Sequence, residues 1–500
     1  MQDVSTIQGS GGQGSGGQGS ALAYEFISDG LAVVQYGSYV RLIYANRNDS
    51  RMASLVLSDS AAAPNPAAGD PVIGAGPGAD IAVQGNATAD RAFVFSRHDG
   101  HLRSTVLGAD GLPGLTKPVQ TDQGYIYGLR AMEIIERGAT DLAVMAQRGV
   151  PGLRLFSVSS AGDFTLTSTM QDTAKSYLGD VADMAAVNIG GRDFLLTASA
   201  LENGVSLFEV DEAGQMSFVD AIGAGDGLAV SGPAALQSVK IGDTQYVVLA
   251  STLSSSLSVL RINEMGVLFV TDHRVDDRIT RFDNVAALDM FSYAGRVFVA
   301  TGGTDSGVTV MELLPDGRLS HMLSKPLETG AGIGTITGVE AEVVGGKALI
   351  FLTVASGDRI HRFEVDLAGI GGLVQAGGGT TTGSALDDRM IGSGLADTLQ
   401  GGAGDDFLHD GGGGDLLFGG AGADVFVFDR DGSADRIGDF QDGIDLIDVS
   451  AWGRIYSAQA LDIRITGSGA VVSYGAEVLT ITKAGPAPLV LTDDDFVFLS

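Results

Sequence analysis

The sequence contains no cysteine among its 500 residues. This absence excludes disulfide bonds and thiolate metal sites, so any bound metal must be held by oxygen or nitrogen ligands. Basic residues are scarce: 30 Lys and Arg stand against 61 Asp and Glu, for a net charge of −31. A chain this acidic repels nucleic acid and anionic membrane surfaces. We therefore expect no nucleic-acid partner.

Long apolar runs are missing as well. The longest, residues 348–355, has the length of a strand and is too short to span a membrane. The N-terminal residues Met1-Gln2-Asp3-Val4 have neither the basic nor the apolar region of a secretory signal peptide. We expect no membrane insertion and no secretory signal at this end.

Recognisable catalytic motifs are absent too. The sequence has no H-E-x-x-H, no G-x-S-x-G and no phosphate-binding glycine loop ahead of a helix. His98 and His101 flank a short polar segment that is more typical of a hairpin turn than of a metal site. Residues 273–278 form the most densely charged loop, and we interpret it as a loop exposed to solvent. Enzymatic activity stays uncertain, and these absences favour a non-enzymatic protein.

Glycine and aspartate are abundant near the C-terminus, in a repeat of nine residues. The aspartates are Asp388, Asp397, Asp406, Asp415 and Asp424, and a large apolar residue follows two positions after each: Met390, Leu399, Leu408, Leu417 and Phe426. The units at 401–409 and 419–427 fit the pattern G-G-x-G-x-D-x-U-x without a mismatch.

This pattern suits calcium. Glycines allow tight turns that present carbonyl oxygens, and each aspartate adds a carboxylate. Ca²⁺ is a hard cation that takes about 6 to 8 oxygen ligands. Nine residues make one half-turn of a parallel β-roll, so each unit stacks on the second one after it. The predicted ligand residues are Asp388, Asp397, Gly401, Gly402, Gly404, Asp406, Asp415, Gly419, Gly420, Gly422 and Asp424.

The units differ in quality. Leu386 and Leu395 replace the fourth glycine of their units, and Asp410 replaces a leading glycine. We therefore expect the best calcium site between Asp406 and Asp424, and weaker or absent binding at the flanking sites. A flexible Gly/Asp linker is the alternative interpretation, but five units in register with apolar residues in phase disfavour it.

The repeats resemble the calcium-binding RTX repeats of bacterial proteins exported by type I secretion. The segments at 423–428, 435–440 and 445–449 are similar to the capping region of that family, and the tail at 493–500 is similar to its uncleaved C-terminal export signal. The resemblance covers about residues 380–500. It implies bound calcium, export by the type I machinery and a secreted or cell-surface location.

The middle of the chain has a longer repeat, with strand pairs about every fifty residues, a spacing typical of propeller blades. The apolar strands lie at 39–45, 92–95, 142–146, 194–198, 246–250, 297–300 and 349–354, and a second strand follows each. The predicted fold is therefore all-β: a seven-bladed β-propeller followed by a C-terminal calcium-binding parallel β-roll. A six- or eight-bladed propeller and a β-sandwich are the alternatives.

The expected domain boundaries follow from these repeats. They are a flexible Gly/Ser/Gln-rich segment at 1–20, a propeller at 21–370, a Gly/Thr linker at 371–382, the β-roll at 383–428 and a cap with the export signal at 429–500. The seventh blade lacks a convincing outer strand of its own, and residues 23–27 are the candidate to supply it. An added strand would remove an open sheet edge, which otherwise invites aggregation.

Two functions remain open for the propeller. It is expected to bind an extracellular ligand, such as a polysaccharide, a surface protein or further copies of itself in a layer, matrix or filament. By blade rhythm alone it resembles lactonase-type propellers, which implies architecture rather than activity. The alternative is a metal-dependent hydrolase, with Asp183, Asn284 and Glu340 as candidate metal ligands near inner strands. Turn and cap roles for these residues are the more common reading.

Overall fold

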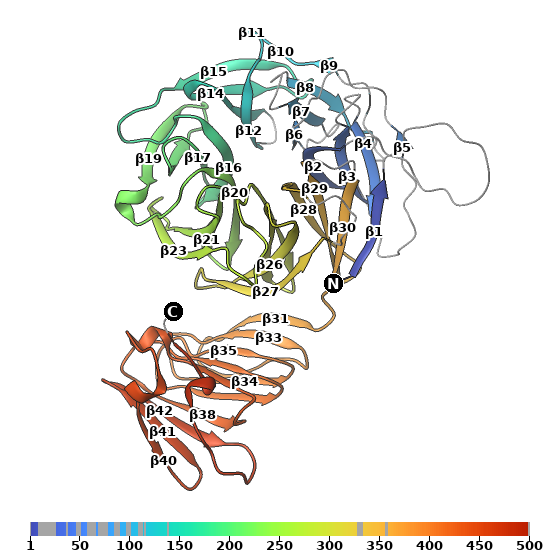
Figure 1. Ribbon diagram of the computed structural model, residues 1–500. Helices are drawn as coiled ribbons and strands as arrows, with labels where there is room; N and C mark the ends of the chain where they lie inside the picture. The colour runs from blue at the N-terminus through green and yellow to red at the C-terminus, as the bar shows by residue number, and fades with distance from the viewer. Residues whose placement is uncertain are drawn as a thin grey trace, which may run out of the picture. The chain divides into compact units, whose positions relative to one another are not determined.

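The computed structural model describes residues 2–8, 27–36, 39–46, 52–57, 67–68, 79–84, 91–96, 102–108, 114, 117–137, 140–327, 334–355 and 359–498. The chain divides into two compact units, Met1–Tyr293 with Val297–Asp366, and Ala294–Arg296 with Leu367–Ser500. Both units are built from strands, which confirms the predicted all-β class (Figure 1). In the described part, no helix is long and apolar enough to cross a membrane.

The N-terminal unit contains seven sheets within the described residues, each an antiparallel meander except where noted below. The first three sheets are β2 (Ile27–Tyr36), β3 (Tyr39–Asn46), β4 (Met52–Leu57) and β5 (Ala67–Ala68); β6 (Ala79–Gln84), β7 (Arg91–Ser96), β8 (Leu102–Val106) and β9 (Lys117–Pro118); and β12 (Leu129–Ile135), β13 (Asp141–Gln147), β14 (Val150–Val158) and β15 (Phe164–Met170), extended by β10 (Gln120–Thr121) and β11 (Gly124–Tyr125).

The remaining four sheets complete the ring. They are β16 (Val181–Ile189), β17 (Arg192–Ser199), β18 (Gly204–Val210) and β19 (Met216–Ile222); β20 (Pro233–Ile241), β21 (Thr244–Ser251), β22 (Ser256–Ile262) and β23 (Leu268–Val275); β24 (Ala287–Tyr293), β25 (Arg296–Gly302), β26 (Gly307–Leu313) and β27 (Leu319–Pro326); and β28 (Ile336–Val344), β29 (Lys347–Val354), β30 (Arg359–Asp366) and β1 (Gln2–Gln8). A short 3₁₀ helix, η1 (Ala224–Asp226), precedes β20.

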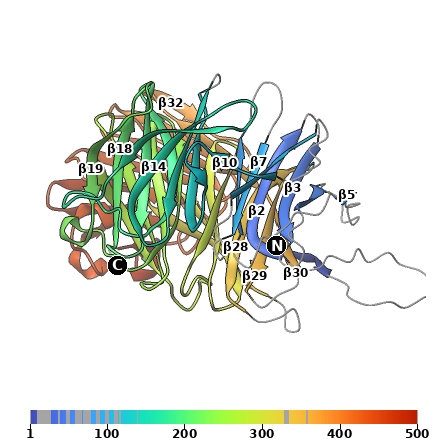
Figure 2. The same cartoon turned by 90° about the horizontal axis from the view of Figure 1, so that it is seen from above.

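The first strand of each sheet contacts the first strand of the next, from β2 through β6, β12, β16, β20 and β24 to β28, and β28 contacts β2. This circuit closes the ring of a propeller, seen face-on in Figure 1 and from the side in Figure 2. The middle strands are apolar without alternation because neighbouring blades cover both of their faces. Every residue of β26 is buried, whereas the outer strand β23 is largely half-buried or exposed.

The N-terminal strand closes the seventh sheet, which corrects the predicted source of that strand. β1 pairs antiparallel with β30, in a register that joins Gln2 to Glu364 and Gln8 to Arg359. The prediction of a flexible segment over residues 1–20 is therefore wrong for 2–8. Of the candidate residues 23–27, only Ile27 is described, and it begins the inner strand β2. The pairing was missed because strand partners far apart in sequence leave no local signal.

Removal of residues 1–8 is expected to expose the backbone edge of β30, because β1 covers that edge. The shortened chain should unfold several degrees lower and aggregate more readily, as read by calorimetry and light scattering. A synthetic peptide with the sequence of Gln2–Gln8 should partly restore the midpoint, and a peptide of the same composition in scrambled order should not. An unchanged midpoint in the shortened chain would show that β1 does not stabilise the ring.

The C-terminal unit is a parallel β-roll whose strands alternate between two sheets over residues 370–448, whereas the three strands within 462–483 all belong to one sheet and pair antiparallel with one another. One sheet contains β31 (Ile370–Gln375), β33 (Asp387–Ile391), β35 (Phe407–His409), β37 (Val425–Val427), β39 (Leu446–Asp448) and β43 (Phe496–Val497). The other contains β32 (Gly379–Thr382), β34 (Asp397–Ala403), β36 (Leu416–Ala421), β38 (Ala434–Phe440), β42 (Glu477–Lys483), β41 (Gly469–Tyr474) and β40 (Asp462–Ile465). Three 3₁₀ helices, η2 (Ser450–Trp452), η3 (Ala458–Ala460) and η4 (Asp493–Asp495), lie among the later strands.

The register follows the nine-residue repeat. Leu399 pairs with Leu417, and Leu408 pairs with Phe426, so each unit stacks on the second one after it. The five apolar repeat residues, Met390, Leu399, Leu408, Leu417 and Phe426, are all 0% exposed and belong to one core. The predicted roll and its thin apolar core are therefore confirmed.

The predicted linker at 371–382 is instead the first turn of the roll. β31 pairs with β33 and β32 pairs with β34, both in parallel. The physical reason is that the carboxylates of the first two repeat aspartates accept hydrogen bonds from backbone amides of this turn. The amide of Gly372 donates to Asp388 Oδ1 at 2.7 Å, and that of Gly378 donates to Asp397 Oδ1 at 2.8 Å.

Candidate calcium sites in the β-roll

The repeat aspartates form two columns, one beside each sheet of the roll. Each lies within one residue of the start of a strand. One column is Asp388, Asp406, Asp424 and Asp445, and the other is Asp397, Asp415 and Asp435. All seven side chains are buried, with at most 3% exposed. Burial of so many carboxylates needs compensation from hydrogen bonds or cations.

The Oδ1 atom of each of these carboxylates accepts a backbone amide. The amide of Asp406 donates to Asp424 Oδ1 at 3.0 Å, and the amide of Asp388 donates to Asp406 Oδ1 at 2.8 Å. In the other column, the amide of Asp397 donates to Asp415 Oδ1 at 2.7 Å. The Oδ1 atoms therefore hold successive turns of the roll together.

The second oxygen is different. The Oδ2 atoms of Asp406, Asp415 and Asp424 are buried and have no hydrogen-bond partner among the described residues. Burial raises the pKa of Asp406 to about 7 and those of Asp415 and Asp424 to about 6, and neighbouring aspartates add to each rise. A buried oxygen without a partner costs free energy, so these three atoms fit ligands of a hard cation.

The glycines of the intact units pack against the preceding turn so closely that no side chain fits. Gly420 has φ 102°, and a Cβ there would lie 2.1 Å from the carbonyl oxygen of Gly402. Gly422 has φ 141°, and a Cβ there would lie 2.0 Å from the carbonyl oxygen of Gly404. Left-handed backbone and close stacking together explain why the repeat requires glycine here.

The first two units satisfy their carboxylates internally. Ser384 stands at the second position of the first unit, and its hydroxyl donates to Asp388 Oδ2 at 2.8 Å. Ser393 does the same for Asp397 Oδ2, also at 2.8 Å. The substituted Leu386 and Leu395 are 40% and 61% exposed at the turns. Serine in place of glycine therefore gives these carboxylates a partner that the third, fourth and fifth units lack.

Two aspartates of the columns, Asp435 and Asp445, lie in the segments that resemble the cap and are not among the predicted ligands. Asp435 Oδ1 accepts the amide of Asp415 at 3.0 Å, and Asp445 Oδ1 accepts that of Asp424 at 3.1 Å. Burial raises the pKa of both carboxyls to about 6. The signal that could have found them is the continued D-x-U pattern in Asp435-Arg436-Ile437 and Asp445-Leu446-Ile447, at spacings longer than nine.

The propeller candidates do not form a comparable cluster. Asp183 accepts the backbone amides of Met184 at 2.9 Å and Leu236 at 2.8 Å, a bond that links two neighbouring blades. Asn284 lies in a turn with φ 51° and donates to Asp283 Oδ2 at 3.0 Å, and Glu340 lies on β28. Among the described residues, both groups of three His, Asp or Glu with ligand atoms within 4.8 Å of one another lie in the C-terminal unit.

The histidines within the described residues are not gathered at one site. His98 and His101 lie outside the described residues. His273 Nδ1 is 2.9 Å from the hydroxyl of Ser258 on the neighbouring strand, which indicates a structural role. His409 Nε2 lies 3.2 Å from Asp429 Oδ1 in the roll.

A model of the RTX calcium-binding nonapeptide repeat matches residues 391–426 in four copies. RTX nonapeptide repeats bind calcium, and the unpaired carboxylate oxygens described above lie in this segment. The fold and the repeats together define the class: an all-β chain in which a β-propeller of unknown function is followed in sequence by calcium-binding RTX repeats.

Two solved structures are similar to this chain over most of their own length. One is a functionally unknown protein from Desulfotomaculum acetoxidans DSM 771, with 16% identity, coverage of 68% of this chain and 95% of that one, and a TM-score of 0.39. The other is a protein from Lactobacillus plantarum, with 15% identity, coverage of 69% and 96%, and a TM-score of 0.42. No curated protein matches the sequence.

Proposed function

We propose that this is a secreted bacterial protein whose C-terminal unit folds on binding calcium after export by a type I machinery. The observation that carries the proposal is the set of buried Oδ2 atoms of Asp406, Asp415 and Asp424 that have no hydrogen-bond partner in the described part. Inside a cell calcium is scarce, so these carboxylates repel one another and oppose compaction. Outside, the free energy of calcium binding becomes free energy of folding. RTX repeats are typical of type I secreted proteins.

Sedimentation velocity with and without millimolar calcium tests this function. Calcium is expected to convert an expanded chain into a compact one and raise its sedimentation coefficient. Large ordered assemblies that appear only with calcium would favour a layer, matrix or filament. A coefficient that is the same at all calcium concentrations would contradict the proposal.

We further propose that the propeller is the binding or self-assembling part of the protein. Leu201 and Leu253 occupy equivalent loops of neighbouring blades, between the second and third strands, and are 72% and 74% exposed. The loops are linked through Gly232, whose amide donates to Asn203 Oδ1 at 2.8 Å and whose carbonyl accepts the amide of Thr252 at 2.9 Å. Exposed apolar side chains at one end of the ring support contact with a polysaccharide, a surface protein or another copy of the chain.

Replacement of both Leu201 and Leu253 by Glu is expected to weaken such contacts by about tenfold, because exposed apolar anchors often dominate an interface. The readouts are binding to producing cells and calcium-dependent self-association. Met265→Glu is the matched control, since Met265 is 73% exposed in the turn between β22 and β23, at the opposite end of the blade. Equal binding by the double variant, the control and the wild type would exclude this end of the ring.

The alternative, a metal-dependent lactonase-like or other propeller hydrolase, has less support. The Asp183 carboxylate already accepts two backbone amides, which is the expected arrangement of a strand-linking residue. Substrate screens on Asp183→Asn and Asn284→Ala test this alternative. A hydrolysis that both changes abolish would restore it.

A further inference from the structure

The fourth repeat unit differs from its neighbours at its first position, where Asp410 replaces glycine. The neighbouring units show what a side chain at this position meets. A Cβ at Gly401 would lie 2.3 Å from Asp406 Oδ2, and a Cβ at Gly419 would lie 2.1 Å from Asp424 Oδ2. The first position therefore faces the unpaired oxygen of its own unit, so a side chain at 410 is directed toward Asp415.

The structure bears out this direction. Asp410, Asp415 and Asp435 each offer a carboxylate oxygen, and these atoms all lie within 4.8 Å of one another. The three side chains are 1%, 1% and 3% exposed. Within the described residues, none of the three forms an ion pair with Lys or Arg, and Asp415 Oδ2 has no hydrogen-bond partner. Three ionised carboxylates cannot share a buried space of this size without a cation.

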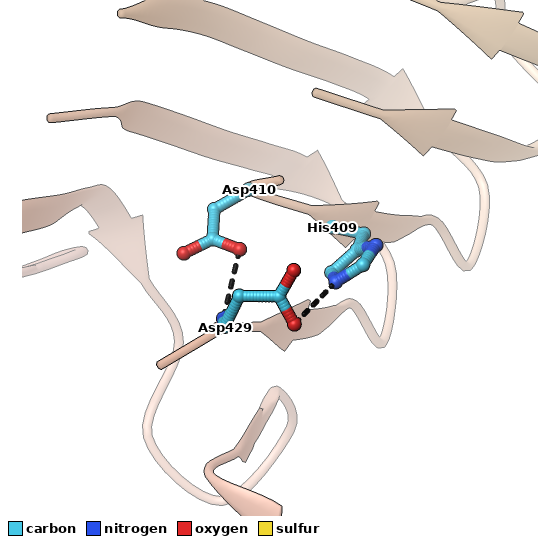
Figure 3. A group of neighbouring side chains, drawn as sticks. All are labelled: His409, Asp410 and Asp429. Atoms are coloured by element: carbon cyan, nitrogen blue, oxygen red, sulfur yellow. Dashed lines mark hydrogen bonds and ion pairs between the residues drawn. The ribbon is translucent and has the colours of Figure 1, made fainter. Parts of the chain in front are cut away.

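The Asp410 carboxylate is held in place by the chain that follows the repeats. Asp410 Oδ1 accepts the backbone amide of Asp429 at 2.9 Å, and the Asp429 side chain lies 3.2 Å from His409 Nε2 (Figure 3). One oxygen of Asp410 is thus used for orientation, as Oδ1 is in the aspartates of the two columns. The Asp410 carboxylate still offers an oxygen within 4.8 Å of oxygens of Asp415 and Asp435.

We propose that Asp410, Asp415 and Asp435 form a three-carboxylate calcium site that the repeat pattern alone does not contain. The inference rests on the proposed calcium-dependent function and reverses the expectation that Asp410 weakens its unit. In the third and fifth units the first position contributes no side chain, whereas here it adds a negative charge to the site. Calcium affinity rises with the number of charged ligands, so this site should be among the tightest in the roll.

Calcium titration in competition with a chromophoric chelator tests the site, on the full chain. Asp410→Gly restores the residue that the intact units have, so the turn can accept it, and Asp410→Asn removes the charge while keeping the size. Both changes are expected to weaken one tight calcium by about tenfold or more, with the other binding steps little changed. Asp462→Asn, at an exposed position of β40, is the control for loss of one surface charge and should leave every step unchanged.

The outcomes separate the two proposals. If the wild type binds no calcium, the proposed function fails and this inference fails with it. If the wild type binds calcium and Asp410→Gly binds it with the same stoichiometry and affinities, only the site at Asp410 is overturned. A gain in affinity on Asp410→Gly would also overturn it, because it would show that Asp410 obstructs the turn.

Discussion

Chelation of calcium is expected to unfold the C-terminal unit while the propeller remains folded. Without a cation, Asp406, Asp415 and Asp424 each keep a buried oxygen with no hydrogen-bond partner in the described part of the chain. Each calcium site stabilises the folded unit by about 2.7 kcal/mol when free calcium is 100-fold above the dissociation constant. Loss of a single site should therefore lower the midpoint of this unit by about 10 °C.

Differential scanning calorimetry in calcium and in excess chelator measures this effect. Two transitions are expected, since the chain has two compact units, and only the one assigned to residues 367–500 should depend on calcium. The propeller transition serves as the internal control. Magnesium should substitute poorly because it demands a smaller, octahedral set of ligands. Identical traces in calcium and chelator would contradict the assignment of the Oδ2 atoms as ligands.

The pH dependence of the C-terminal unit is expected to reverse when calcium is added. Burial raises the pKa of Asp406 and Asp410 to about 7, and those of Asp415, Asp424 and Asp435 to about 6, from 3.8. Without calcium, the folded unit therefore binds more protons than the unfolded chain between about pH 4 and 7. Its stability should be greatest below about pH 4 and should fall as pH rises from 4 through 7.

Calcium must displace those protons, so its affinity should fall by about tenfold for each pH unit below the pKa of a ligand. The calcium-induced rise in midpoint should be large at pH 8 and small at pH 5. Midpoints at both pH values, with calcium and with chelator, provide the measurement. Burial also raises the pKa of Glu133 to about 8 and that of Asp289 to about 6 in the propeller. The unfolding transition of the propeller should therefore shift with pH by the same amount with and without calcium. A calcium effect of equal size at pH 5 and pH 8 would contradict the titration.

Much of the roll could be predicted because each nonapeptide encodes its own turn. Glycine is required where φ is positive and turns touch, as at Gly420, and the apolar residue of each unit is fully buried, as at Leu408. The blades could also be predicted from local sequence, because consecutive strands of a blade pair with one another. Leu142 to Ala146, for example, lies within β13, which pairs with β12 and β14.

Interactions between distant or irregular residues could not be read in this way. Ser384 and Ser393 replace glycine, but only the structure reveals that their hydroxyls satisfy the carboxylates of Asp388 and Asp397. The role proposed for Asp410 could not be predicted from the repeat pattern, because the pattern evaluates each position alone. That role depends on Asp435, which lies outside the nonapeptide array. Side-chain partners across turns are a property of three-dimensional packing rather than of spacing.

The pairing of β1 with β30 has a consequence for the order of events during folding. The first residues of the chain must find Glu364 and its neighbours, so the ring cannot close until nearly the whole propeller sequence is present. Closing a loop of several hundred residues costs about 5 kcal/mol of chain entropy. Such distant pairings also slow folding. The propeller should therefore pass through an open, crescent-shaped intermediate with an exposed edge, and its lifetime sets the time during which the new chain can be captured or degraded.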